Sequence, residues 1–203
     1  YLRKKAMLAG VTMVAPETVF LKRDTRFGQD VTIEPNVIFG SNVSLAKKCH
    51  IKSFCYLEEC TIGEGNVIGP FARIRPNTIT KQNVKIGNFV EVKKSNINRG
   101  TKISHLSYIG DTIIGENANI GAGTITCNFD GYKKYTTNIG SGAFIGSNTS
   151  LIAPLNIGEN VIIGAGSVIT EDTPSESLSL SRTKQKTIVG GSKKITKRQK
   201  KHL

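Results

Sequence analysis

The sequence predicts an all-β solenoid built from hexapeptide repeats, because large aliphatic residues recur every six positions. The clearest run of these anchors is Ile139, Ile145, Leu151, Ile157, Ile163 and Ile169, and glycine follows four of them. A period of six matches neither one face of an α-helix nor an uninterrupted two-faced strand. It matches a β-helix in which each hexad forms one short flat side and a bend. The composition agrees, since 21 glycines, no tryptophan and 6% aromatic residues suit a narrow interior filled by aliphatic side chains.

The same period begins at Phe27 and predicts how the coils stack. It continues to Ile169, slipping by one residue before Ile62 and again before Ile114, with a looser turn expected over residues 77–85. Three sides of about six residues make a coil of about 18, so residue i should lie beside residue i+18, and the run holds about seven to eight coils. The open ends of such a stack need covering, which we expect from the segments before and after it.

Three segments follow from this pattern. Residues 1–18 are expected to form a short linker helix and a connector that ends near Pro16. Residues 19–174 are expected to form the β-helix, and residues 175–203 a basic C-terminal tail. The polar and aromatic stretch 126–138 interrupts the repeat, so we expect it to be a loop that projects from the solenoid.

Positive charge is concentrated in the tail. The formal net charge is +13, and the residues from 182 onward contribute +9 of it, which leaves +4 (13 − 9) for the rest. The nine tail cations are Arg182, Lys184, Lys186, Lys193, Lys194, Lys197, Arg198, Lys200 and Lys201. Such a tail indicates either an acidic partner, such as a phosphate-bearing ligand, nucleic acid or a membrane surface, or simply a solvated terminus.

The location of the protein is indicated by its apolar runs and its cysteines. No apolar run approaches the ~18 residues that span a bilayer, and no signal-peptide pattern is visible. The four cysteines form no Cys-x-x-Cys pair, and Cys49 and Cys55 fall on inward repeat positions. Buried thiols of this kind are typical of a reducing compartment, so we expect a cytoplasmic protein.

Polar residues in otherwise regular hexads are the candidates for chemistry, because the interior of such a prism is too narrow for a ligand. They gather in four segments, GPFARIRP (69–76), GNFVEVKK (87–94), SHLSYIGD (104–111) and NIGAGTITCN (119–128). Coil arithmetic brings Arg75, Lys93 and Asp111 near one another, with His105 one side away. Two neighbouring cations would suit a phosphate group, although each alone could be an ordinary surface charge.

Taken together, these segments resemble the C-terminal acetyltransferase domain of the bacterial bifunctional GlmU enzymes, which are uridyltransferases and glucosamine-1-phosphate acetyltransferases. The resemblance runs from residue 7 to residue 182, and its most specific stretches are the four above, extended to NIGAGTITCNFDG, and the final Ser181-Arg182. It implies a left-handed parallel β-helix, an exception to the usual right-handed crossover, assembled as a homotrimer with active sites between subunits. The family's N-terminal uridyltransferase domain is absent from this chain, and any Mg²⁺ would belong to that domain.

The resemblance also implies an acetyl-CoA-dependent N-acetyltransferase that acts on glucosamine 1-phosphate, in the route to UDP-GlcNAc and cell-wall precursors. Carried over by motif, His105 is the catalytic base. The residues implied for substrate binding are Arg75, Lys93, Tyr108, Asn119 and Lys134, the last reaching in from a neighbouring subunit. The residues implied for binding acetyl-CoA are Ala122, Asn128, Phe129, Ser147, Ala165 and Arg182. Neither a metal, nor nucleic acid, nor a membrane is expected to take part.

The implied chemistry is reasonable for these residue types. Attack of an amine on a thioester needs a group that accepts the amine's proton, and an imidazole titrating near neutrality suits this task. A backbone N–H in the turn 121–123 could stabilise the oxyanion, and Glu91 could orient the imidazole or a substrate hydroxyl. No acyl-enzyme is required, so Cys127 is expected to be structural. The chain departs from the family at Phe129, where tyrosine is usual, and affinity for the cofactor would fall modestly if that hydroxyl made a contact.

Three other functions remain open at this point, because a hexapeptide prism does not specify one. A zinc hydratase of the γ-carbonic anhydrase type shares the fold but needs three histidines, and the chain has only His50, His105 and His202. Another acyltransferase of this fold could use a different acceptor. A non-enzymatic solenoid could bind nucleic acid through its basic tail, with affinity that falls steeply as salt rises.

Overall fold

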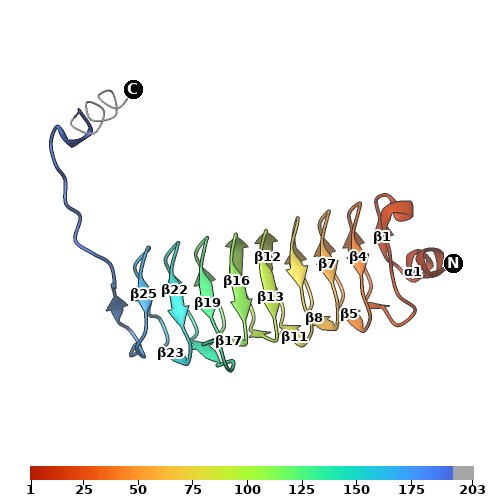
Figure 1. The fold of residues 1–203 in the computed structure, drawn as a ribbon. Helices are drawn as coiled ribbons and strands as arrows, with labels where there is room; N and C mark the ends of the chain where they lie inside the picture. Colours follow the sequence, from red (N-terminus) through yellow and green to blue (C-terminus); the bar gives the residue numbers. More distant parts are fainter. Residues whose placement is uncertain (194–203) are drawn as a thin grey trace.

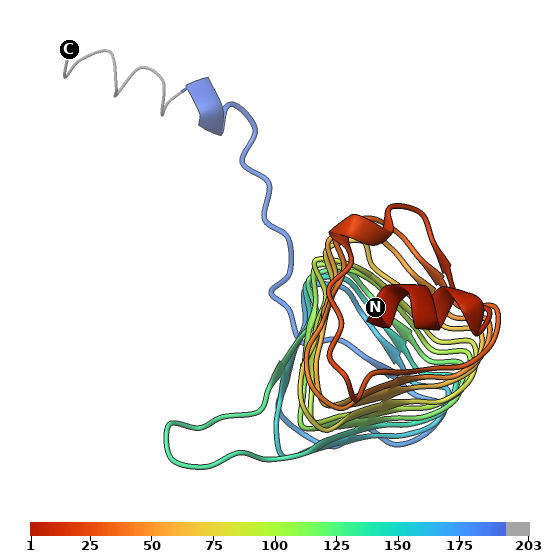
Figure 2. The same ribbon diagram turned by 90° about the vertical axis from the view of Figure 1, so that its right-hand side faces the viewer.

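The chain folds into a triangular prism whose three sides are parallel β-sheets (Figures 1 and 2). The computed structural model describes residues 1–193, so the part of the predicted basic tail from residue 194 onward lies outside the described residues. Every pairing between named strands is parallel, and from β2 to β25 consecutive strands go to successive sheets. The expected all-β class and the parallel β-helix are therefore confirmed.

The three sheets are numbered so that, from β3 onward, the chain passes from sheet 1 to sheet 2 to sheet 3 in each coil. Sheet 1 contains β1 (Thr12–Met13), β3 (Thr32–Ile33), β6 (His50–Ile51), β9 (Val67–Ile68), β12 (Lys85–Asn88), β15 (Lys102–His105), β18 (Asn119–Ile120), β21 (Phe144–Ile145), β24 (Ile162–Ile163) and β26 (Leu178–Ser179). Sheet 2 contains β4 (Ile38–Phe39), β7 (Tyr56–Leu57), β10 (Arg73–Ile74), β13 (Glu91–Lys93), β16 (Tyr108–Gly110), β19 (Ile125–Cys127), β22 (Ser150–Ile152) and β25 (Val168–Ile169). Sheet 3 contains β2 (Arg26–Phe27), β5 (Val43–Leu45), β8 (Cys60–Ile62), β11 (Thr78–Thr80), β14 (Asn96–Ile97), β17 (Thr112–Ile114), β20 (Thr137–Ile139) and β23 (Leu155–Ile157). The edges where the sheets meet are called corners 1–2, 2–3 and 3–1.

The strand register explains the slips in the six-residue period. Ile145 pairs with Ile163, which is a coil of 18 residues, whereas Ile86 pairs with Ile103, a coil of 17. At each slip the coil is therefore one residue shorter, and a residue still points inward at the anchor position. Between β17 and β20 the pairing of Ile114 with Ile139 spans 25 residues, so this coil carries 7 extra (25 − 18). They form the expected loop, which projects well beyond the prism (Figure 2).

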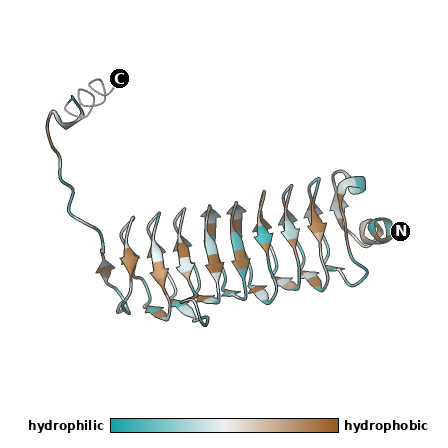
Figure 3. Cartoon of the chain, viewed as in Figure 1, coloured by the Kyte–Doolittle hydropathy of each residue, from teal (hydrophilic) through white to brown (hydrophobic). Residues whose placement is uncertain are grey.

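The interior is a set of aliphatic columns, one rung per coil. The isoleucines that pair along sheet 1 from Ile33 to Ile163 are almost fully buried, and hydrophobic segments recur on every coil (Figure 3). Burying such a side chain contributes about 1.5–3 kcal/mol. Where a loose turn was expected over residues 77–85 the prediction is wrong, because β11 fills this position. Its inward residues Thr78 and Thr80 are fully buried and hydrogen-bonded, so the aliphatic pattern is broken there but the strand is not.

Glycines follow the anchors because the neighbouring coil leaves no room for a side chain. A Cβ on Gly140 would lie 2.4 Å from the Gly158 carbonyl, and one on Gly146 would lie 2.4 Å from the Ala165 nitrogen. Neither glycine has a positive φ. Close approach of successive coils, and not backbone conformation, therefore selects glycine at these two positions.

One end of the prism is covered by the segment before the repeats, whereas the chain after β26 leads away from the other end (Figure 1). Helix α1 (Leu2–Leu8) lies across the first coil (Figure 2), and the short 3₁₀ turn Pro16–Thr18 follows it. Strand pairing crosses both predicted boundaries, because β1 lies before residue 19 and β26 lies after residue 174. The boundaries 1–18, 19–174 and 175–203 stay a prediction. Within the described residues, no helix is both long and apolar enough to cross a membrane.

The stacked core makes a simple prediction about stability. Replacing the fully buried Ile51 with alanine should lower the free energy of unfolding by about 2–4 kcal/mol, through lost burial and the cavity left behind. Urea unfolding followed by circular dichroism would measure this. Ile79→Ala, at a position that is 43% exposed, is the matched control and should change stability far less; equal losses in both would contradict the assignment of inward and outward faces.

Candidate active site

The expected cation pair lies on the outer face of sheet 2. Arg75 directly follows β10 and Lys93 ends β13, and the pairing of Ile74 with Val92 sets the two side by side. Arg75 Nη1 lies 2.7 Å from Glu91 Oε1, and Lys93 Nζ lies 3.5 Å from Asp111 Oδ2. Both cations are therefore oriented by carboxylates of the next coils. Glu91, considered above as a partner of the imidazole, is instead bonded to Arg75.

Asp111 is the buried centre of this cluster, at corner 2–3. Its side chain is 5% exposed and contacts Lys93, Lys94 at 3.2 Å, and the side-chain amide of Asn128. Burial raises the pKa of Asp111, but the hydrogen bonds from Asn128 and Lys94 and the charges of both lysines outweigh burial, so its pKa lies below the usual value. Asp111 thus remains a carboxylate that anchors two lysines and the start of the projecting loop.

Lys134 belongs to the projecting loop, yet it interacts with the cations of its own chain. Close contact with the Lys93 amino group, followed by the like charge of Lys93, holds the pKa of Lys134 below its ordinary value. The same contact is the main cause that raises the pKa of Lys93, and Asp111 adds to the effect. The cluster therefore contains four cations and two carboxylates, Glu91 and Asp111, and its formal charge is +2 (4 − 2). The cations are Arg75, Lys93, Lys94 and Lys134. That excess suits a phosphate monoester dianion.

His105 lies one corner away, at the end of β15, with an exposed side chain. Its Nδ1 is 2.6 Å from Oδ1 of Asn88, its register partner on β12. An amide oxygen only accepts hydrogen bonds, so Nδ1 carries the proton and Nε2 keeps the free lone pair. The imidazole is therefore held in the tautomer that can accept a proton at Nε2.

In the coils after His105, small residues occupy the equivalent position along corner 1–2. Ile103 pairs with Ile120, Ile120 with Ile145, and Ile145 with Ile163. Two positions beyond these isoleucines stand His105, Ala122, Ser147 and Ala165, which form one column. The carbonyls of Ala122 and Ser147 accept hydrogen bonds from the following coil, at 2.7 and 2.8 Å, and Arg182 Nη1 donates to Ala165 O at 2.8 Å. We call this line the His105 column. It contains three of the six residues expected to bind acetyl-CoA, and a fourth, Arg182, is bonded to it.

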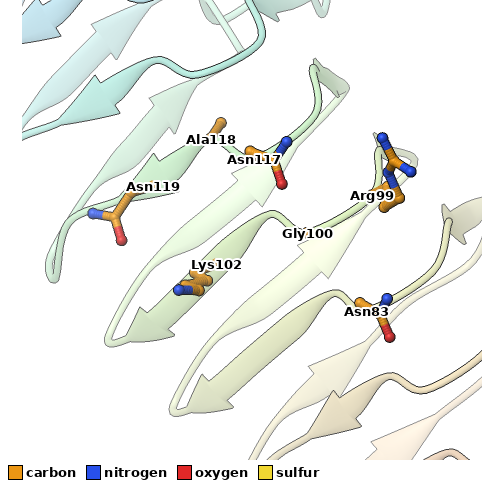
Figure 4. A pocket seen from close by; sticks show the side chains of 7 residues that line it. All are labelled: Asn83, Arg99, Gly100, Lys102, Asn117, Ala118 and Asn119. Carbon is orange, nitrogen blue, oxygen red and sulfur yellow. The ribbon is translucent and has the colours of Figure 1, made fainter.

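The remaining expected residues lie elsewhere on the prism. Tyr108 begins β16 and pairs with Glu91, so it borders the cation cluster. Asn119 begins β18 at the opposite end of sheet 1, in a shallow hollow at corner 3–1 with Arg99 and Lys102 (Figure 4). Asn128 is buried against Asp111, and Phe129 is 58% exposed at the base of the loop. A single chain thus divides the expected site among three corners.

Comparisons with known proteins now bear on this geometry. The family profile described as the GMPPB C-terminal domain matches residues 58–129, and the one described as bacterial transferase hexapeptide (six repeats) matches residues 136–171. The bifunctional protein GlmU of Agrobacterium fabrum is 50% identical over 198 residues, which is 98% of this chain and 44% of that protein. The GlmU of Azorhizobium caulinodans is 54% identical over 184 residues, 91% of this chain and 41% of that protein. Over this stretch, the chain belongs with the GlmU proteins.

Two further facts define what this relationship covers. The chain spans about 44% of the length of the curated GlmU relatives it matches. Among solved structures, a UDP-N-acetylglucosamine acyltransferase has a TM-score of 0.59 at 14% identity, covering 84% of this chain and 71% of that one. LpxA from Acinetobacter baumannii has a TM-score of 0.50 at 18% identity, with the same coverage. These two structures share the fold of this chain, whereas the similarity in sequence is to the GlmU relatives.

Sequence reasoning missed one residue of this candidate site. Asn88 fixes the tautomer of His105, but it stands 17 residues before it, whereas the coil arithmetic assumed 18. The slip in the hexad frame was the available signal, since it marks the 17-residue coils. In the described part of the chain, no group of three or more His, Cys, Asp or Glu side chains could hold a metal ion.

The charge of Asp111 predicts a pH dependence of stability. Because its pKa is lower in the folded protein than the unfolded value of about 3.9, its stabilising contribution is present above about pH 4 and is lost as pH falls through the folded pKa. Asp111→Asn should therefore lower the melting temperature at pH 7 and bring it closer to that of the parent protein near pH 3.

Melting curves measured between pH 3 and pH 7 would test this dependence. Asp30→Asn, at an exposed left-handed turn, is the matched control and should follow the parent. A difference between Asp111→Asn and the parent that stays constant over this range would contradict the assigned role of the Asp111 charge.

Proposed function

We propose that this chain is an N-acetyltransferase that moves an acetyl group from acetyl-CoA to the amine of glucosamine 1-phosphate. The product would be N-acetylglucosamine 1-phosphate, a precursor of UDP-GlcNAc and the cell wall. The observation that carries the proposal is His105, held by Asn88 with Nε2 free, between the small-residue column and the cation cluster. The relationship to GlmU proteins at about half identity supports the same reaction.

The cation cluster would hold the acceptor sugar. A phosphate monoester carries up to two negative charges, and Arg75 offers a planar donor pair that Glu91 already orients. Lys93 and Lys134 add point charges, and the depressed pKa of Lys134 would recover when a phosphate dianion approaches both lysines. Tyr108 borders this cluster and would contact the sugar. Asn119 would complete the acceptor site from another corner.

The column would hold the acyl donor. Ala122, Ser147 and Ala165 present small side chains along one edge, so an extended pantetheine chain could lie close to the backbone there. Arg182 is bonded to Ala165 at the end of the His105 column, and its guanidinium would bind the phosphates of the nucleotide part of acetyl-CoA. Asn128 and Phe129 would contribute from the base of the loop. Acetyl-CoA is the cosubstrate in this proposal, and no metal takes part.

The reaction would then run in two steps around His105. The sugar amine attacks the thioester carbonyl while Nε2 accepts its proton, and the carbonyl π electrons move onto oxygen. The C–S bond breaks as the carbonyl re-forms, and the imidazolium returns the proton to the thiolate, so that coenzyme A leaves as a thiol. Gly121 N–H is already bonded to Ile145 O, at 2.8 Å, which leaves Ala122 and Gly123 as the candidate oxyanion donors of this turn.

Assembly as a homotrimer would bring the divided groups together. In one chain, the His105 column lies on corner 1–2, whereas Asn128, Phe129 and the projecting loop lie on corner 2–3. A ring of copies would place corner 2–3 of one prism against corner 1–2 of the next, because a heterologous contact repeated around a three-fold axis closes. Each active site would then be built from neighbouring subunits. A cytoplasmic location, with neither nucleic acid nor membrane as partner, accompanies this proposal.

A thiol-release assay with acetyl-CoA tests the function. The chain should release coenzyme A with glucosamine 1-phosphate far faster than with unphosphorylated glucosamine, and His105→Ala should reduce the rate by about 10²–10⁴. Ile79→Ala is the matched control, because it changes an exposed residue on sheet 3 away from the site. Equal use of both acceptors would contradict the phosphate assignment, and an active His105→Ala would remove the assigned base.

Asn88 should act through His105 and can be tested by two substitutions. Asn88→Ala removes the acceptor for Nδ1–H and should lower kcat by about tenfold or more, with little change in the KM for acetyl-CoA. Asn88→Asp keeps an acceptor and adds a negative charge that favours imidazolium, so activity should persist with its pH profile displaced upward. Steady-state rates between pH 6 and pH 9 would measure both. Identical pH profiles for the parent and Asn88→Asp would show that Asn88 does not tune the imidazole.

A further inference from the structure

Gly110 lacks a side chain for a different reason from Gly140 and Gly146. A Cβ on either of those two glycines would collide with the backbone of the next coil. A Cβ on Gly110 would instead meet side chains, since its three nearest atoms would be Tyr108 Oη at 2.5 Å, and Asn128 Nδ2 and Tyr108 Cζ at 2.8 Å each. Coil stacking therefore does not account for glycine at this position, whereas two residues of the candidate site do.

Neither the backbone nor the hexad pattern requires glycine here. Gly110 does not have a positive φ, so alanine could adopt its conformation. The register of sheet 2 assigns residues with side chains to the equivalent outward position of the two preceding coils and the two following ones. These residues are Arg75, Lys93, Cys127 and Ile152. Gly110 is therefore a gap in a row of outward side chains.

The phenol of Tyr108 fills this gap. Tyr108 and Gly110 are two residues apart on β16, so both face outward from the sheet. Because Oη and Cζ both reach residue 110, the ring lies along its own strand, over the backbone of Gly110. The hydroxyl ends beside the amide of Asn128 and next to Lys93, the register partner of Gly110. Gly110 thus leaves the room through which this hydroxyl reaches the cation cluster.

Of the two side chains over Gly110, the phenol is the one that can move. Asn128 is 6% exposed and donates a hydrogen bond to Asp111, which itself contacts two lysines. Tyr108 is only partly buried. A methyl group at residue 110 would therefore push the phenol away from the sheet and leave the contacts of Asp111 in place.

We propose that Gly110 is a positioning residue for the acceptor, and that it acts by keeping open the space for the Tyr108 phenol. The inference rests on the function proposed above. With the ring against the sheet, the hydroxyl lies beside the cations assigned to the phosphate and can donate a hydrogen bond to the sugar phosphate. With the ring displaced, that hydrogen bond is lost. Gly110 would therefore set the affinity for the acceptor without touching it, and the binding of acetyl-CoA would not depend on it.

Steady-state kinetics of single and double variants test this role. Gly110→Ala should raise the KM for glucosamine 1-phosphate about tenfold, as expected for the loss of one hydrogen bond, and change the KM for acetyl-CoA by less than about twofold. Tyr108→Ala should raise the same KM, and adding Gly110→Ala to it should have little further effect, because the ring to be displaced is gone. Effects of the two substitutions that simply multiply would overturn the inference.

The double variant also covers the case in which Gly110→Ala alone does not fold. Tyr108→Ala removes the ring with which the new methyl group collides, so Gly110→Ala/Tyr108→Ala should recover the circular dichroism of the parent. A double variant that remains unfolded would mean that the backbone requires glycine at this position, and it would overturn the inference.

Gly40 provides the matched control. It occupies the same hexad position on sheet 2, two coils before Arg75. A Cβ there would also meet side chains, at 2.8 Å from Glu58 Cβ and 3.4 Å from Tyr56 Oη. Because these residues lie outside the candidate site, Gly40→Ala should leave both KM values unchanged. A rise in the KM for glucosamine 1-phosphate that is equal in Gly40→Ala and Gly110→Ala would contradict a specific role of Gly110.

A measurement that does not depend on activity follows the ring itself. The chain has five tyrosines, so incorporation of 3-fluorotyrosine gives five ¹⁹F signals, and Tyr108→Phe identifies the one from Tyr108. Gly110→Ala should shift that signal, and Gly40→Ala should not. A Tyr108 signal that does not respond to Gly110→Ala overturns the inference, even if acetyl transfer is observed. If the signal moves as expected but the parent transfers no acetyl group, the packing of Tyr108 on Gly110 is supported and the proposed function is contradicted.

Discussion

Close stacking of one coil on the next is the constraint on which the rest of the structure depends. Each inward isoleucine must sit on its counterpart in the adjacent coil, and Gly140 and Gly146 show that the backbones approach too closely for a Cβ at the following position. A coil can lose one residue or extrude seven, yet an inward residue still occupies the anchor position, and in β11 this residue is Thr80. Variation is therefore confined to the outward positions and the corners, and chemistry on this fold has to be placed there.

Because of this constraint, equivalent residues of successive coils line up along the axis of the prism. One outward residue per coil produces the His105 column, another produces the adjacent Arg75 and Lys93, and one turn position produces a stack of exposed phenylalanine rings along corner 1–2. Each array is straight because the sheets are parallel and in register. An extended acyl donor and a compact sugar phosphate are very different in shape. On a prism, the extended acyl donor can lie along a corner and the sugar phosphate can bind to a charged face, so no internal pocket is needed.

Charge and conformation are distributed unevenly among the three corners. Corner 2–3 carries Asp111 with its lysines and the projecting loop, and corner 1–2 carries the imidazole and the exposed rings. A single prism presents these groups in different directions, since its corners point apart. The ring of three copies proposed above would bring these unlike corners of identical chains together. The acyltransferase structure at a TM-score of 0.59 shares the fold of this prism, and the GlmU proteins are related to the chain in sequence.

The sequence by itself determined the all-β class, the six-residue period, the projecting loop and the proximity of Arg75 to Lys93, because these depend only on periodicity and composition. It did not predict β11, whose buried threonines hide the pattern, or the contact of Asn88 with His105, which needs a 17-residue coil. Tertiary structure alone decided that Glu91 binds Arg75, that Asp111 gathers two lysines, and that Phe54, Phe71 and Phe89 stack outward. Such contacts depend on one-residue differences in coil length and on the direction in which each corner points, and neither is fixed by local preference.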